Sequence, residues 1–146
     1  MFTLAITAAC AGTPEEPKSG HVTLEGQDPR ILIHDGSGPA MQALLLGQLV
    51  YNASTKCLAV KASGQPDSPV TLVWPPETRP TIKDGKRGVI LRYKELALLE
   101  GTEVRIGGGF VDWVKHPPPG WTLPDACIAD SSNAAIFQVN PISPVS

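Results

Sequence analysis

The sequence lacks a long hydrophobic run and lacks a cluster of positive charge. No stretch approaches the roughly 20 apolar residues of a membrane-spanning helix, so we expect any membrane attachment to come through a lipid or a partner. Twelve Lys and Arg against fourteen Asp and Glu give a net charge of −2, and the longest basic block is the turn at residues 83–87. Because phosphate binding depends on clustered cations, this composition argues against nucleic acid as a partner.

Motifs of metal binding and nucleophilic catalysis are also missing. His21, His34 and His116 stand in unrelated contexts, with no His-x-x-x-His or Cys-x-x-Cys spacing to gather metal ligands. There is no Gly-x-Ser-x-Gly element to present a nucleophilic serine. We therefore expect no metal, no cofactor and no assigned catalytic residue.

Three residues remain as candidates for contact with a ligand. Asp112 stands on an expected strand close to His116, and a carboxylate beside an imidazole can act as an acid and base pair. The alternative is that Asp112 simply faces outward from a half-buried strand. Trp121 follows a Pro-Gly breaker and is the best candidate for an exposed aromatic contact, whereas Trp74 is expected to fill the core.

The apolar residues come in short runs between strong chain breakers, and fifteen Pro and fourteen Gly indicate many tight turns. This pattern predicts an all-β fold, a small closed or partly open barrel of the OB type with about six or seven short strands, with a two-sheet sandwich as the alternative. Asp84-Gly85 predicts a hairpin, the Gly-rich stretch 107–109 predicts another turn, and helix is limited to short turns at 94–100 and 123–128. The expected strands are 43–51, 57–61, 70–74, 88–92, 103–106, 110–114 and 134–139.

An odd number of cysteines calls for one with a separate role. Cys10 ends a short apolar run after Thr7-Ala8-Ala9, a context that resembles the lipobox of bacterial lipoproteins. The resemblance implies a signal-like segment at residues 1–9, a lipidated Cys10 and a flexible Pro-rich tether over residues 10–20. The alternative is that the first residues form a frayed apolar end.

Cys57 and Cys127 are then free to pair if the protein is exported, because oxidising compartments preserve disulfides. A bond between them requires Cα atoms within about 7 Å. Two separate buried thiols in a cytosolic protein are the alternative.

The middle of the chain resembles a family of uncharacterised small bacterial envelope domains. The resemblance covers about residues 47–127 and rests on Trp74-Pro75-Pro76, on the alternating strand before the Gly-rich turn, and on Pro124-Asp125-Ala126-Cys127. Glu77 stands where that family usually has Gly. The resemblance implies a lipid-anchored β-barrel domain at the outer face of the cytoplasmic membrane.

From these observations we expect a lead-in strand or hairpin at residues 21–42, a β-barrel domain at 43–140 and a tail at 141–146. The expected function is a non-catalytic binding or structural module whose partner is a cell-wall glycan or an envelope protein. The alternative is a small-ligand carrier or an enzyme that uses the loops near Asp112, His116 and Trp121.

Overall fold

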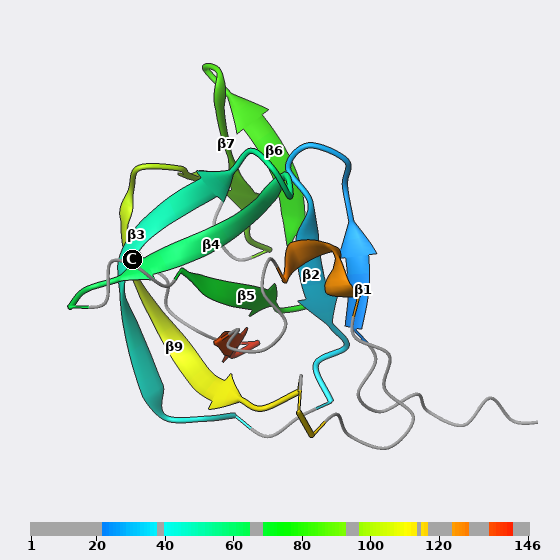
Figure 1. Ribbon diagram of the computed structural model, residues 1–146, viewed down its shortest axis with the longest axis vertical. Helices are drawn as coiled ribbons and strands as arrows, with labels where there is room; N and C mark the ends of the chain where they lie inside the picture. The colour runs from blue at the N-terminus through cyan, green and yellow to red at the C-terminus, as the bar shows by residue number, and fades with distance from the viewer. Residues whose placement is uncertain are drawn as a thin grey trace, which may run out of the picture.

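The computed structural model describes residues 22–37, 40–64, 69–92, 97–113, 115–116, 124–128 and 135–141. Within these residues the chain forms ten strands and one 3-10 helix, and no α-helix (Figure 1). The all-β prediction is therefore confirmed. The elements are β1 (Val22–Glu25), β2 (Ile31–His34), β3 (Ala43–Asn52), β4 (Cys57–Ala62), β5 (Val70–Trp74), β6 (Arg79–Lys83), β7 (Lys86–Ile90), β8 (Ala97–Leu99), β9 (Glu103–Val111), η1 (Asp125–Cys127) and β10 (Ile136–Val139).

Seven strands form the main sheet in the order β1-β2-β5-β10-β9-β3-β4, and β4 also pairs with β5. The strands β3, β4, β5, β10 and β9 therefore close a ring of hydrogen bonds. Within the ring β5 and β10 run parallel, while the other pairs are antiparallel. The β4–β5 contact that closes the ring pairs only two residues of each strand, Ala59 with Thr71 and Val60 with Val70. This arrangement fits the small, partly open β domain that the sequence predicts.

Two additions extend the ring. β1 and β2 form an antiparallel hairpin, and β2 joins the main sheet by parallel pairing with β5. β6, β7 and β8 form a separate antiparallel sheet between β5 and β9 in the chain, and Figure 1 shows the β6–β7 hairpin projecting at one end of the domain. Asp84 and Gly85 make the β6–β7 turn with φ values of 52° and 75°, which confirms the predicted hairpin.

The main hydrophobic core lies inside the ring and contains the fully buried Trp74 and Phe137. The alternation that fills it is clearest on β3, where Leu45 and Leu49 are buried while Leu44 and Leu46 are exposed. Trp74 has the role in the core that its sequence context predicts. Its indole Nε1 has no hydrogen-bond partner among the residues that the structure describes.

A second hydrophobic cluster covers the other face of the sheet at β2, β5 and β10. Val73 belongs to this cluster while its neighbours Leu72 and Trp74 belong to the main core, so the two clusters lie on opposite faces of β5. Trp113 and Cys127, which follow β9 in the chain, pack onto this face. Trp113 and η1 therefore cover this face of the sheet, and η1 lies beside β2 in Figure 1.

The disulfide between Cys57 and Cys127 holds this cover in place. Cys57 begins β4 and Cys127 ends η1, with their Cα atoms 5.5 Å apart. The Thr71 hydroxyl also donates a hydrogen bond to the carbonyl of Cys127, at 3.3 Å. The predicted pairing of the two cysteines is confirmed.

Two local predictions are wrong. β9 runs unbroken through the glycines at 107–109, so this stretch is strand and not a hairpin turn. Glycine is needed there for space, because a Cβ on Gly108 would collide with the carbonyl oxygen of Gln138 on the neighbouring β10. Residues 97–99 form β8 and not part of a helix, since pairing with β7 outweighs their helical propensity.

Candidate functional site

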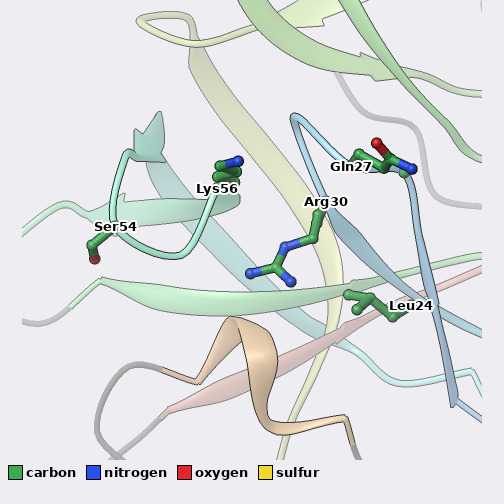
Figure 2. A pocket seen from close by; sticks show the side chains of 6 residues that line it. Leu24, Gln27, Arg30, Ser54 and Lys56 are labelled. Atoms are coloured by element: carbon green, nitrogen blue, oxygen red, sulfur yellow. The ribbon is translucent and has the colours of Figure 1, made fainter.

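An open hollow of about 350 Å³ lies between the β1–β2 turn and the β3–β4 turn. One side is formed by the end of β1 and the turn after it, and the other by the turn that precedes Cys57. Figure 2 shows Arg30 reaching from the first segment toward the second, with Lys56 on the opposite side. The hollow is lined by Leu24, Gly26, Gln27, Arg30, Ser54 and Lys56.

The β3–β4 turn is shaped by the side chain of Asn52. Its Oδ1 accepts hydrogen bonds from the backbone N–H of Ser54 at 2.9 Å and from the Ser54 hydroxyl at 2.7 Å. The N–H of Lys56 donates to the carbonyl of Asn52 at 2.7 Å, which closes the turn. Lys56 then takes a φ of 61°, in the left-handed region that favours glycine, and its side chain stands exposed at the hollow.

Arg30 is fixed to the same turn by three hydrogen bonds. Its backbone N–H donates to the carbonyl of Lys56 at 2.6 Å. Its Nε and Nη2 donate to the carbonyl of Thr55 at 3.1 and 2.5 Å. The guanidinium has five N–H bonds, so three of them have no partner among the residues that the structure describes. Arg30 is thus held to the β3–β4 turn while it lines the hollow.

The carboxylate of Asp28, which follows the lining residue Gln27 in the β1–β2 turn, is already paired with another cation. Arg87 on β7 donates from Nε and Nη2 to the two oxygens of Asp28 at 2.9 and 3.2 Å. The Tyr51 hydroxyl donates to Asp28 at 2.7 Å, and the guanidinium of Arg87 lies 4.2 Å from the centre of the Tyr51 ring. The hydrogen bond from Arg87, followed by that from Tyr51, lowers the pKa of Asp28. Since none of the residues that line the hollow is acidic, Arg30 and Lys56 make it electropositive.

The sequence candidates Asp112 and His116 do come together. His116 Nδ1 lies 2.9 Å from Asp112 Oδ2, and the His116 N–H donates to the Asp112 carbonyl at 2.9 Å. The hydrogen bond from His116 is the main cause that lowers the pKa of Asp112. Both side chains are largely exposed, at 81% for His116 and 62% for Asp112, and neither lines the hollow. The pair is therefore open to water, and a ligand contact at it stays a prediction.

Two other candidates lie outside the described residues, namely Cys10 and Trp121. In the part of the chain that the structure describes, no three His, Cys, Asp or Glu side chains gather where they could hold a metal ion. In the same part, no helix has the length and apolar character needed to cross a membrane.

Sequence reasoning missed Arg30 and Lys56 as site residues. Each is a single basic residue in a polar segment, and the two are far apart in the sequence. They lie close together because the backbone of Arg30 pairs with that of Cys57. The parallel pairing of β2 with β5 brings the β1–β2 turn and the β3–β4 turn together. No local sequence pattern predicts this pairing.

His34 is a buried histidine whose two ring nitrogens are both bonded. Its Nε2 lies 2.7 Å from the carbonyl of Val139, and its Nδ1 accepts the N–H of Gly36 at 3.0 Å. The acceptor role of Nδ1 means that the neutral ring carries its proton on Nε2 and donates it to Val139. Burial, the largest cause, lowers the pKa of His34 below its ordinary value of 6.5.

Acidification is expected to destabilise the protein through His34. The native state disfavours the charged ring, so the unfolded chain binds more protons, and the free energy of unfolding falls as the pH drops below about 6.5, by at most about 1.4 kcal/mol per pH unit. Urea unfolding between pH 7.5 and 5 measures this slope. His34→Gln, which keeps a donor without a titrating ring, should flatten it, whereas Lys83→Gln, at an exposed position of β6, should leave it unchanged. Equal slopes in wild type and His34→Gln would contradict the assignment.

No protein-family model, no curated protein sequence and no solved structure matches the chain. The resemblance to small bacterial envelope domains therefore enters the functional argument as a hypothesis.

Proposed function

We propose that this protein is a non-catalytic binding module of the bacterial cell envelope, anchored to the outer face of the cytoplasmic membrane through a lipid on Cys10. The observation that carries the proposal is the Cys57–Cys127 disulfide, because such bonds persist in oxidising compartments outside the cytoplasm. Once these two cysteines are paired, Cys10 is the remaining one of the three, at the end of the apolar run that resembles a lipobox.

The fold favours binding at the turns rather than on the sheet. OB-type domains commonly bind oligosaccharides or oligonucleotides on one sheet face together with the flanking loops. Here Trp113 and Cys127 cover the sheet at Val73 and Ile136, and the disulfide fixes this cover. Binding at the electropositive hollow between the β1–β2 and β3–β4 turns needs no displacement of this cover.

The backbone at Glu77 supports the resemblance to envelope domains. Its φ of 67° lies in the region that favours glycine, the residue that the resembled family carries after Trp-Pro-Pro. In this chain the Glu77 carboxylate forms an ion pair with Arg92, with Glu77 Oε2 2.5 Å from Arg92 Nε.

The second candidate function, a small-ligand carrier or an enzyme, is favoured by the hydrogen bond between Asp112 and His116. An enzyme would need a concave site that excludes water around such a pair. The high exposure of both side chains makes the binding module the better supported function.

Replacement of Cys10 tests the anchor. We expect the full-length protein to fractionate with membranes and to incorporate labelled fatty acid, and we expect Cys10→Ala to abolish both. Globomycin, which blocks lipoprotein signal cleavage, should cause the uncleaved precursor to accumulate. Lys83→Gln is the control, because it changes an exposed residue and leaves all three cysteines in place. Membrane association that is equal in Cys10→Ala and wild type would refute lipid anchoring.

A further inference from the structure

We propose that the hollow between the β1–β2 and β3–β4 turns binds a sugar unit that carries a carboxylate or a phosphate. The inference deepens the proposed binding role and rests on it, since it names the chemistry that the module would recognise. The site consists of the Arg30 guanidinium and the Lys56 ammonium, with Leu24, Gln27 and Ser54 beside them.

Charge is the first argument. Arg30 is positioned by its bonds to Thr55, and a guanidinium held in one orientation suits the planar, two-point recognition of a carboxylate or phosphate. Lys56 adds a second cation and has no ion-pair partner among the described residues. Lys56 contributes slightly to the lowered pKa of Asp28, but both oxygens of Asp28 are bonded to Arg87. The Asp28 carboxylate is therefore not available to take the place of an anionic ligand beside Lys56.

Size and polarity are the second argument. A volume of about 350 Å³ lies at the lower end of the range of small-molecule sites and is suited to a single sugar ring rather than a larger ligand. The amide of Gln27 can bond to sugar hydroxyls, and the Ser54 hydroxyl, which already donates to Asn52 Oδ1, can accept a hydrogen bond from one. The half-buried Leu24 offers an apolar surface to a ring face. A bare inorganic anion would use the two cations and leave these other groups without a role.

The backbone of Lys56 is the third argument. The left-handed conformation of Lys56, with a φ of 61°, is unfavourable for a residue that has a Cβ, and glycine at this position would avoid that strain. The chain nevertheless places a lysine there, beside Arg30. Strained residues of this kind concentrate at functional sites. Here the strained backbone places the Lys56 ammonium at the hollow, where it can contact an anionic ligand.

NMR titration of the full, disulfide-bonded chain tests the proposal with four probes: glucuronate, glucose 6-phosphate, glucose and inorganic phosphate. We expect the two charged sugars to shift the Arg30 Nε–H and the amides of residues 54–56, with dissociation constants on the order of millimolar. Glucose should not bind, and inorganic phosphate should bind more weakly than glucose 6-phosphate. A preference for glucuronate or for glucose 6-phosphate identifies the natural group as carboxylate or phosphate.

Lys56→Gly is the decisive variant, because it removes the cation and relieves the strained backbone. We expect it to unfold at a temperature equal to or above that of wild type, while its affinity for the charged sugars falls about tenfold. Lys83→Gln, at the exposed end of β6, is the matched control and should bind as wild type does.

Three results would overturn the site: no shifts with any charged sugar, equal binding of glucose and glucuronate, or unchanged affinity in Lys56→Gly. Equal binding of inorganic phosphate and glucose 6-phosphate would overturn the sugar specificity. These failures are distinguishable from a failure of the envelope function, because membrane anchoring through Cys10 is measured separately.

Discussion

Removal of the Cys57–Cys127 disulfide is expected to lower the free energy of unfolding by about 4 kcal/mol. The bond joins positions 70 residues apart, and in the chain-entropy account a loop of this length restricts the unfolded chain strongly. A loss of this size is a large part of the 5–15 kcal/mol by which domains are usually stable.

Without the disulfide, the loss of structure should begin on the face of the sheet that the second hydrophobic cluster covers. Without the bond, Trp113 and the segment at Cys127 are held over Val73 and Ile136 mainly by apolar packing and by the Thr71 hydrogen bond. We therefore expect amide exchange to accelerate first at η1 and on β5 and β10, while the main core around Leu49 and Ile106 stays protected longer.

Urea unfolding compares the double variant Cys57→Ser/Cys127→Ser with the disulfide-bonded protein. Both proteins also carry Cys10→Ala, which prevents thiol exchange with the third cysteine. Chemical reduction of the disulfide-bonded chain is the second route to the same state and should give the same loss. Free thiols at both positions in protein purified from an oxidising compartment would show that the bond does not form. An unchanged free energy of unfolding would show that the bond does not stabilise the fold.

The sequence predicted the fold well where the signal was local. Short apolar runs between breakers located most strands of the ring to within about two residues, and Asp84-Gly85 located a hairpin because both positions need positive φ. The cysteine count predicted the disulfide because Cys10 was expected to have a role of its own, which left Cys57 and Cys127 to pair.

Prediction was poorer where distant partners decide the outcome. Residues 97–99 have good helix formers, but β7 offers them a strand partner, and the addition of β2 beside β5 joins segments far apart in the chain. The hollow depends on this second pairing, since it brings Arg30 onto the β3–β4 turn. The Asp112–His116 contact was predictable from their spacing because it is local, four residues apart.

Gly108→Ala is expected to destabilise the protein by about 3 kcal/mol, the upper part of the range for overpacking a well-packed interior. An added Cβ would collide with the carbonyl oxygen of Gln138 and lie 2.7 Å from Cε1 of Phe137. β10 cannot easily move away, because all four of its residues are buried, with Phe137 and Val139 in the main core and Ile136 in the second cluster. The strand must therefore shift against packing on both of its faces.

The same substitution distinguishes the two interpretations of the glycine run. If residues 107–109 formed an exposed hairpin turn, alanine at 108 would be tolerated unless φ were positive, and Gly108 does not have a positive φ. In the strand, the collision is with backbone, which no side-chain rotation relieves. Urea unfolding compares Gly108→Ala with Arg105→Ala, an exposed position of the same strand that should change the free energy of unfolding by less than about 0.5 kcal/mol. A stability of Gly108→Ala within that margin of wild type would mean that β9 and β10 are not packed this closely, and that the ring is open at this edge.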